Sequence, residues 1–411
     1  MTMERFDCLI VGAGHAGAEA AITLRQAGFD GTIGLVGNEA VLPYERPALS
    51  KEYLGGKKSF DQLLLRPADF WAEHNVSVRL GLQVTGIDAP VKTVTCDDGQ
   101  EIGYGVLVWA TGGSPRKLDC PGHDLDGIHA IRDLADCDRL MSVLPESRRI
   151  AVIGGGFVGL EAAAVLRELG KDVVIIEALD RFLARVAAEP VSRFYETEHR
   201  SRGVEVHLGT GVSEIMGRAG AVSGVRLNDG RVIEADQVIV GIGIIPAIQP
   251  LLLAGAEATA GSTGVLVDDH CRTSVADIYC VGDCAVLRNG PGIRIESRQN
   301  ATEQAQTAAK AISGKAEPLN LVPWFWSNQY DLRLKTIGLS LGYDETVLRG
   351  DPDSGSFSLI YLKQGAVIAL DCINATKDYM QGRRLVENGS RIDPAILANE
   401  RTPLKEMAAA I

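Results

Sequence analysis

The feature that most constrains the fold is the glycine pattern G-x-G-x-x-G, which first occurs near the start of the chain. Gly12, Gly14 and Gly17 form it, directly after the strand-like run 6–11 and before a helix-like stretch that leads to a second strand-like run. The first glycine of such a turn permits a sharp bend, the second lets a pyrophosphate approach the backbone, and the third lets the helix pack on the strand. Because amides at a helix N-terminus favour anions, the segment predicts a dinucleotide-binding unit.

The pattern recurs in the middle of the chain. The strand-like run 149–153 leads into a turn with Gly154, Gly156 and Gly159 at the glycine positions, and a helix-like stretch and a further strand-like run follow. Two dinucleotide sites in one chain imply two cofactors that meet, and the order of FAD-then-NAD(P) flavoproteins predicts FAD at the first turn. A duplicated unit that binds the same nucleotide twice is the alternative.

The residue after the second strand of each unit indicates how a ribose is held. In the second unit this residue is Glu177, a position at which an acidic side chain accepts the adenosine ribose hydroxyls. A carboxylate there repels a 2′-phosphate, so we expect NADH to be preferred to NADPH, although Arg181 is close in sequence. The first unit instead has Asn38, followed by Glu39, and an amide binds a ribose more weakly than a carboxylate does.

Further strand-like runs are expected to reach the same sites. The runs 106–113 and 236–246 are each expected to be a strand after which the chain crosses between the two nucleotide-binding domains. The first run ends in a small-residue turn at Ala110, Thr111 and Gly112, and the corresponding residues of the second run are Gly241, Ile242 and Gly243. Asp283 follows the buried run 278–281, and ligands bind α/β sheets at the carboxyl ends of strands. Asp283 is therefore expected to hold the ribityl hydroxyls of a flavin.

Composition limits the remaining possibilities. A chain of 411 residues predicts two or three domains, and its net charge of −12 disfavours binding to nucleic acid or to an anionic membrane. No apolar run is long enough to cross a membrane and the start, Met1–Asp7, has no apolar signal core, so a soluble cytoplasmic protein is expected. The eight cysteines lack C-x-x-C spacing and the seven histidines form no H-E-x-x-H, so we expect buried thiols and no metal.

Several segments together resemble one known family. They are GAGHAG, PYERPALSK (43–51), VWATGG, GGGFVGLEAAA, GIGIIP, YCVGDC, ESRQNA and PWFWSNQYDLRL (from Pro323), and they extend over nearly the whole chain. This set resembles the oxygenase-coupled NADH:ferredoxin reductases, the family of putidaredoxin reductase and of the ferredoxin reductases of aromatic dioxygenases. The block PWFWSNQYD is more specific than either glycine turn.

The resemblance implies an α/β fold with two Rossmann-like domains arranged as in glutathione reductase, followed by a C-terminal α+β domain. The FAD-binding domain would be split between 1–114 and 248–322, the NAD-binding domain would be 115–247, and the C-terminal domain would be 323–411. Strand-like stretches at 336–339, 357–362 and 367–369 agree with a separate antiparallel sheet in the last of these.

The resemblance also implies roles for individual residues. For FAD these are Gly12, Gly14, His15, Ala16 and Gly17 at the pyrophosphate, Lys51 and Trp326 beside the flavin ring, Val84 at the adenine, and Asn38, Ala110, Thr111, Gly112, Arg132, Asp283 and Arg298 elsewhere along the cofactor. For NADH they are Gly154, Gly156, Phe157, Val158, Gly159, Glu177, Gly241, Ile242 and Gly243. Arg298 departs from the family, in which this position is usually apolar.

The implied chemistry centres on Lys51, Glu161 and Trp326. Hydride would pass from nicotinamide to flavin, Lys51 would stabilise the negative charge of the reduced flavin, and Glu161 would keep the lysine charged. The stretch 43–51 contains no cysteine, which disfavours reduction of disulfides or of peroxide. Rubredoxin reductase, NADH oxidase and an NADH-sensing flavoprotein of the same fold are the alternatives.

The implied partner is an acidic [2Fe–2S] ferredoxin that supplies an oxygenase with a haem-thiolate or Rieske centre. Residues 323–411 carry ten Lys or Arg against eleven Asp or Glu, so they are nearly neutral in a chain of net charge −12. The candidate docking residues are Arg333, Lys335, Arg383 and Arg384, with Arg66 from the predicted FAD domain. A monomer or weak homodimer is expected.

Overall fold

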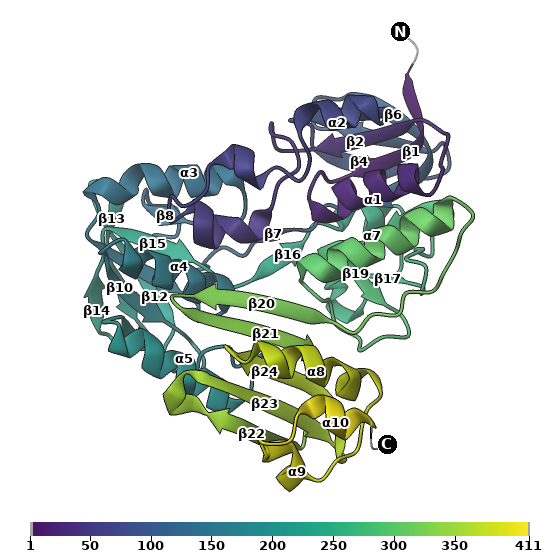
Figure 1. Ribbon diagram of the computed structural model, residues 1–411. Helices are drawn as coiled ribbons and strands as arrows, with labels where there is room; N and C mark the ends of the chain where they lie inside the picture. Colours follow the sequence, from purple (N-terminus) through teal and green to yellow (C-terminus); the bar gives the residue numbers. More distant parts are fainter. Residues whose placement is uncertain (1–2, 410–411) are drawn as a thin grey trace. The chain divides into compact units, whose positions relative to one another are not determined.

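The computed structural model (Figure 1) describes residues 3–409. The chain divides into two compact units. The first unit contains the chain up to Pro47, Ser59–Ser114 and Ile244–Leu321. The second contains Ala48–Lys58, Pro115–Gly243 and the chain from Val322 onward. Met1 and Thr2, part of the start that lacks a signal core, and the last two residues of the predicted C-terminal domain lie outside the described residues.

A sheet of seven strands forms the centre of the first unit, in the order β3-β2-β1-β6-β5-β4, with β18 also paired to β6. Its strands are β1 (Glu4–Val11), β2 (Ile33–Gly37), β3 (Val76–Leu80), β4 (Val84–Asp88), β5 (Thr93–Cys96), β6 (Glu101–Trp109) and β18 (Ile278–Cys280). The pairs β1–β2, β1–β6, β2–β3 and β6–β18 are parallel, so these strands deliver their carboxyl ends to one edge of the sheet. The order of strand, glycine turn, helix and strand predicted for this unit is thereby confirmed.

Two helices of the first unit, α1 (His15–Gln26) and α7 (Arg298–Ile312), lie side by side (Figure 1). Their buried faces are rich in alanine, and Ala20 and Ala305 belong to the same apolar core as Ile10 of β1. Small side chains let the helices approach closely, which brings the start of α7 near the first glycine turn. Shorter elements complete the unit: α2 (Ala68–Glu73), β7 (Gly113–Pro115), β16 (Ile244–Pro246), α6 (Gln249–Leu253), β17 (Val265–Val267) and β19 (Ala285–Leu287).

A parallel sheet of five strands in the order β11-β10-β9-β15-β8 forms one part of the second unit. Its strands are β8 (Ile128–His129), β9 (Arg149–Ile153), β10 (Asp172–Ile176), β11 (Glu205–His207) and β15 (Gln237–Val240). The accompanying elements are α3 (Leu134–Val143), α4 (Phe157–Glu168), α5 (Glu189–Ser201) and the antiparallel strands β12 (Val212–Arg218), β13 (Ala221–Leu227) and β14 (Val232–Glu234). The strand, glycine turn, helix and strand predicted for the second unit are therefore also present.

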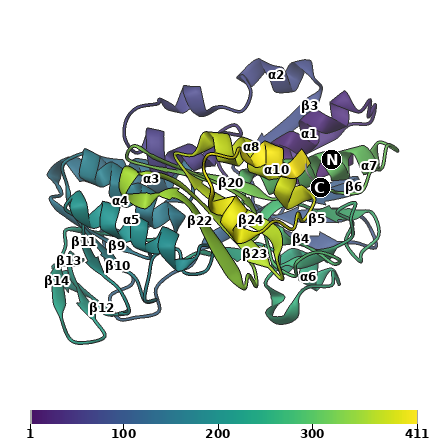
Figure 2. The ribbon, with the colours of Figure 1, turned by 60° about the horizontal axis from the view of Figure 1, so that its bottom comes forward.

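The C-terminal part of the second unit is an antiparallel sheet in the order β20-β21-β24-β23-β22, accompanied by the helices α8, α9 and α10 (Figure 1; α8 and α10 also in Figure 2). The elements are β20 (Trp324–Gln329), β21 (Leu332–Gly338), β22 (Glu345–Asp351), β23 (Ser356–Lys363), β24 (Ala366–Ile373), α8 (Thr376–Glu387), α9 (Pro394–Ala398) and α10 (Leu404–Ala409). The three predicted strand-like stretches correspond to β21, β23 and β24. The two strands without a prediction, β20 and β22, are the edges of the sheet.

The segment Ala48–Lys58 packs with the second unit. It contains a helical turn, η2 (Leu49–Tyr53), and the carbonyl of Leu49 accepts a hydrogen bond from the thiol of Cys137 on α3 at 3.3 Å. This packing places Lys51 in the same unit as the second glycine turn. The three-part division by ligand expected from the sequence remains a proposal, since packing alone gives two units.

Two expectations from composition concern the whole chain. Of the eight cysteines, all except Cys120 are buried, as expected for structural thiols. Among the described residues no helix has both the length and the apolar character needed to cross a membrane.

A buried carboxyl group lies in the C-terminal sheet. Asp371 of β24 is 4% exposed and accepts a hydrogen bond from the hydroxyl of Tyr361 on β23. Burial raises the pKa of Asp371 from 3.8 to about 7. Between these two values the folded protein holds a proton that the unfolded chain has released, so the free energy of unfolding falls as the pH rises through this interval.

We expect Asp371→Asn to remove this dependence, because an amide oxygen still accepts the Tyr361 bond but does not titrate. The free energy of unfolding of the variant minus that of the wild type should be about 1–3 kcal/mol more positive at pH 8 than at pH 4. Urea unfolding at the two pH values measures the difference, with the exposed Asp353→Asn as the control. An equal effect of Asp371→Asn at both pH values would contradict the assignment.

Candidate functional site

The first glycine turn is shaped by close backbone contacts. Gly12 has a φ of +110°, and a Cβ atom added to it would lie 2.3 Å from the carbonyl oxygen of Ala110. A Cβ atom on Gly17 would lie 1.8 Å from the carbonyl oxygen of Gly12, so only glycine lets α1 pack this closely on the turn. Gly14 differs, because its nearest neighbour is the flexible side chain of Arg46 at 3.7 Å. The predicted roles of the three glycines fit this geometry.

The start of α1 has the properties of a phosphate site. Gly14 is its N-cap and supplies no side-chain cap, and the first turn of the helix contains no acidic residue. The Nε2 atom of His15 is buried and has no hydrogen-bond partner among the described residues. Burial lowers the pKa of His15 to about 3, with Arg298 and Arg46 contributing, so the ring is neutral and offers one N–H. These residues fit the pyrophosphate of FAD.

The neighbourhood of the predicted ribose site contains an ion pair that the sequence did not indicate. Asn38 is exposed, whereas the Glu39 carboxylate accepts hydrogen bonds from the Tyr44 hydroxyl and the Arg46 guanidinium. Arg298, the first residue of α7, is 40% exposed and forms an ion pair with Glu45 at 3.1 Å. The charge of Arg298 is therefore paired with the carboxylate of Glu45. This pairing accommodates an arginine at a position that is usually apolar in the family.

The other predicted FAD residues of the first unit follow β6 and β18 or lie on β4. The turn Ala110–Gly112 comes directly after β6, and the hydroxyl of Thr111 donates to the carbonyl of Ala247 at 2.8 Å. Asp283 lies half-buried in the turn after β18. Val84, predicted to contact adenine, is a buried residue of β4. Roles at FAD for these residues stay proposals.

The second glycine turn repeats the geometry of the first. Gly154 has a φ of +111°, and a Cβ atom on it would lie 2.4 Å from the carbonyl oxygen of Gly241. Gly156, the N-cap of α4, supplies no side-chain cap, and a Cβ atom added to it would have no described neighbour within 4 Å. Glu177 follows β10, and its carboxylate accepts hydrogen bonds from the amides of Gly155 at 2.6 Å and Leu179 at 2.8 Å. This carboxylate is thus fixed beside the turn.

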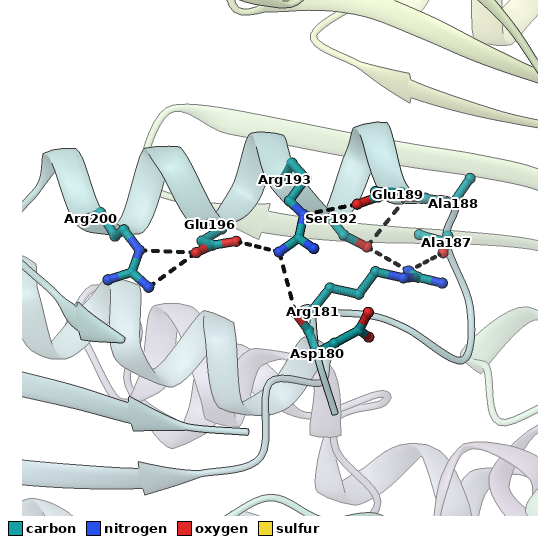
Figure 3. Close-up of polar contacts among 9 residues, drawn as sticks. All are labelled: Asp180, Arg181, Ala187, Ala188, Glu189, Ser192, Arg193, Glu196 and Arg200. Carbon is teal, nitrogen blue, oxygen red and sulfur yellow. Dashed lines mark hydrogen bonds and ion pairs between the residues drawn. The ribbon is translucent and has the colours of Figure 1, made fainter. Parts of the chain in front are cut away.

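Arg181 is engaged by the loop that follows Glu177 (Figure 3). Its guanidinium donates to the carbonyls of Ala187 at 2.7 Å and Ala184 at 3.1 Å, and to the hydroxyl of Ser192 at 2.8 Å. These bonds tie the loop to the start of α5. Because the Arg181 guanidinium is engaged in these bonds, we do not expect it to bind a 2′-phosphate, and the prediction that Glu177 selects NADH is kept.

The remaining residues predicted for NADH surround this turn. Phe157 begins α4, and the centroid of its ring lies 4.5 Å from the centroid of the Phe325 ring. Val158 is 42% exposed. The Gly241–Gly243 segment follows β15, and the amide of Gly241 donates to the carbonyl of Ile153 at 2.8 Å. The structure therefore brings these residues together at the carboxyl ends of β9 and β15.

Lys51 and Glu161 form a buried ion pair, as the resemblance implied. Lys51 Nζ lies 2.5 Å from Glu161 Oε2, and the two side chains are 10% and 3% exposed. Ser50 donates to the same carboxylate oxygen at 2.6 Å, and Ser327 of β20 donates to Oε1 at 2.7 Å. Both oxygens of Glu161 are therefore satisfied by donors. Glu161 is therefore a buried residue of α4 and not an exposed one.

Sequence reasoning missed the two serines. Ser50 stands next to Lys51, and Ser327 lies inside the block PWFWSNQYD, so both were in quoted motifs without a role. Trp326, beside Ser327 on β20, is half-buried, and the centroid of its ring lies 5.6 Å from the centroid of the Trp324 ring. Arg132 lies half-buried just before α3. The roles of Trp326 and Arg132 at the flavin cofactor stay proposals.

The candidate docking residues lie in both units. Arg333 and Arg384 are exposed. Lys335 Nζ lies 5.2 Å from the centroid of the Tyr379 ring, and Arg383 pairs with Glu387 within α8 at 2.7 Å. Arg66 belongs to the first unit, where its guanidinium lies over the ring of Phe70. Among the described residues one group, Asp268, Asp269 and His270, has three possible metal ligands close together, and the absence of a metal stays a prediction.

The chain matches two family models. The model described as pyridine nucleotide-disulphide oxidoreductase matches residues 6–311, and the model described as reductase C-terminal matches residues 324–408. Together they extend over both predicted nucleotide-binding domains and the antiparallel sheet that follows.

Individual proteins are similar along nearly the whole length. A 5,5′-dehydrodivanillate O-demethylase ferredoxin reductase subunit from Sphingobium sp. is 54% identical and the alignment covers 99% of this chain and 100% of that protein. A rubredoxin-NAD(+) reductase from Pseudomonas putida is 38% identical over 90% of this chain and 96% of that protein. The crystal structure of a covalent putidaredoxin reductase–putidaredoxin complex superposes with a TM-score of 0.94 at 38% identity, covering 99% of this chain and 98% of that one.

Proposed function

The chain belongs to the pyridine nucleotide-disulphide oxidoreductase family, and we propose that it is an FAD-dependent NADH:ferredoxin reductase of a bacterial oxygenase system. FAD and NADH are its cofactors. The observation that carries the proposal is the buried Lys51–Glu161 ion pair, which lies in a chain with two complete dinucleotide turns and a reductase C-terminal domain. A cytoplasmic location is part of the proposal.

The cofactors supply hydride transfer themselves, and the protein supplies orientation and charge. Lys51 offers a cation in a site with little water, where a positive charge interacts more strongly than it does in solvent. A buried lysine without a partner tends to lose its proton, so Glu161 keeps Lys51 charged. The hydroxyls of Ser50 and Ser327 satisfy the carboxylate without neutralising it.

Reduction of a disulfide is disfavoured, because no cysteine lies in the segment 43–51 and the cysteines are almost all buried. A rubredoxin reductase is the second candidate, since a relative with that name is 38% identical. We expect the purified protein to hold about one FAD and to reduce a [2Fe–2S] ferredoxin with NADH much faster than it reduces a rubredoxin. Faster reduction of rubredoxin would favour the second candidate, and a protein without flavin absorbance would overturn both.

The face of α8 is the proposed docking site for an acidic ferredoxin. Lys377, Met380, Arg383 and Arg384 are all exposed on this helix, and Met380 is 68% exposed. An apolar side chain among cations suits a partner whose binding surface is acidic with an apolar centre. Complementary charge accelerates encounter, so the rate of ferredoxin reduction should fall as salt rises.

Arg384→Glu should lower ferredoxin-dependent kcat/KM about 5- to 10-fold and leave NADH–ferricyanide activity unchanged, because a small acceptor needs no docking face. Steady-state assays with both acceptors at low and moderate salt measure the effect. Arg218→Glu, which reverses an exposed charge on β12, is the matched control and should change neither activity. An equal loss with both acceptors, or no loss with ferredoxin, would place the docking site elsewhere.

A further inference from the structure

A continuous line of buried polar side chains leads away from Glu161 within the second unit. Ser327 Oγ lies 2.7 Å from Glu161 Oε1, and Gln329 Nε2 lies 3.3 Å from Ser327 Oγ. Gln329 Oε1 lies 2.9 Å from His199 Nε2, and His199 Nδ1 lies 3.1 Å from the hydroxyl of Tyr330. Ser327, Gln329 and His199 are each at most 1% exposed.

The chemistry of these groups fixes the direction of every bond. A carboxylate only accepts, so Ser327 must donate its single hydroxyl proton to Glu161 and accept from the amide nitrogen of Gln329. The oxygen of Gln329 only accepts, so His199 must donate from Nε2. His199 is neutral, because burial lowers its pKa to about 4, and its Nδ1 therefore accepts from Tyr330. All the donors point toward Glu161.

The opposite direction is incompatible with an ionised Glu161. If the Gln329 amide were turned, its oxygen would accept the proton of Ser327, and the lone pairs of Ser327 would face Glu161 Oε1. That arrangement is satisfied only when Glu161 itself carries a proton and donates it to Ser327. The direction of the line and the charge on Glu161 are therefore coupled.

The outer end of the line is held in place by other contacts. The guanidinium of Arg202 lies over the Tyr330 ring, 4.5 Å from its centroid, and forms an ion pair with Asp331 at 2.6 Å. The ring of Phe182 packs edge-on against His199, with 5.9 Å between the centroids. These contacts restrict the side chains that orient His199.

We propose that Gln329 and His199 are positioning residues that direct the Ser327 hydroxyl onto Glu161 and so hold the Lys51–Glu161 pair in its charged form. The inference rests on the proposed function, because it assigns these residues an effect on reduction of FAD by NADH. The groups that face Glu161 are Lys51 and Ser50 from η2 and Ser327 from β20. The buried hydroxyl of Tyr195 on α5 also interacts electrostatically with Glu161. Because Gln329 donates to Ser327 Oγ, the hydroxyl proton of Ser327 is directed to Glu161.

The variant Gln329→Met tests the proposal, because methionine is close to glutamine in shape and removes both hydrogen bonds. Gln237 provides the matched control, since its Oε1 lies 2.9 Å from Nε2 of His129, another buried histidine, in a pair without a contact to Glu161. At saturating NADH, Gln329→Met should slow flavin reduction about 5- to 10-fold with KM for NADH within about 2-fold of wild type. Gln237→Met should leave both values unchanged.

A second measurement does not depend on activity. In protein with ¹⁵N-labelled histidine, the ring of His199 should be neutral with its proton on Nε2 at pH 7, and this signal should change in Gln329→Met and not in Gln237→Met. Tyr330→Phe should shift the His199 Nδ1 signal and slow flavin reduction less than Gln329→Met does.

A proton on Nδ1 of His199 in the wild type would overturn the inference, and so would flavin reduction by Gln329→Met within about 2-fold of the rate of Gln237→Met. In either case the proposed function would stand, provided that NADH reduces the wild-type flavin. If NADH failed to reduce the wild-type flavin at all, the proposed function would fail instead, and the histidine signal would still report the direction of the line.

Discussion

Lys51→Met should slow reduction of the bound FAD by NADH about 10²-fold while changing the affinity for NADH by less than about 3-fold. The positive charge is needed when negative charge develops on the flavin, which makes its effect larger in the transition state than in the bound ground state. Methionine keeps the length and much of the apolar stem of lysine. Stopped-flow absorbance over a range of NADH concentrations separates the limiting rate from the apparent dissociation constant.

Lys57→Met is the matched control, because it removes a lysine from the same segment. Lys57 pairs with Glu168 at 2.7 Å, but its side chain is 63% exposed, so the pair is screened by water and salt. The control should reduce the flavin at the wild-type rate. If Lys51→Met did so as well, within about 2-fold, Lys51 would have no part in the reaction.

The wild-type protein should use NADH with a kcat/KM about 10²-fold above that for NADPH, because Glu177 would face the 2′-phosphate with a like charge. Glu177→Gln keeps an amide oxygen for one of the two backbone bonds and removes the charge. We expect this variant to narrow the ratio to about 10-fold or less, through weaker use of NADH and stronger use of NADPH. Initial rates with both coenzymes and ferricyanide measure the ratio.

Glu189→Gln is the control for that experiment. Glu189 begins α5 and lies in the network of Figure 3, where it pairs with Arg193 at 3.2 Å, so the change removes a carboxylate without touching the end of β10. It should leave the ratio of the two coenzymes unchanged. Equal use of NADH and NADPH by the wild type would show that Glu177 does not face the adenosine ribose.

The parts of the fold that could be predicted from sequence are those with local signals. Gly12, Gly154 and their partners stand at fixed spacing between an apolar run and a helix, and this spacing reports the backbone requirement directly. The edge strands β20 and β22 carried no such signal. Only one side of an edge strand is paired, and β22 places Glu345, Leu348 and Asp351 in solvent, so its apolar content is low.

The candidate site also contains residues that were predicted and residues that were missed. The pairing of Lys51 with Glu161 joins residues 110 positions apart, and only the resemblance to a family indicated it. Ser327, Gln329 and His199 were not assigned a role, because a buried polar residue has no periodic pattern. Their partners are distant in sequence, since Ser327 bonds to Glu161 of α4 and Gln329 bonds to His199 of α5. The pair of Glu39 with Arg46 was also missed. The prediction for the ribose considered Asn38 and gave no role to Glu39, the next residue in the sequence.

The most direct test of the central claim is an anaerobic transfer of electrons to a [2Fe–2S] ferredoxin. The protein is mixed with a limiting amount of NADH and an excess of oxidised ferredoxin, and the ferredoxin and flavin spectra are followed together. Because NADH carries two electrons and each ferredoxin accepts one, about two ferredoxins should be reduced for each NADH consumed. A flavin that NADH reduces fully while the ferredoxin stays oxidised would contradict the account.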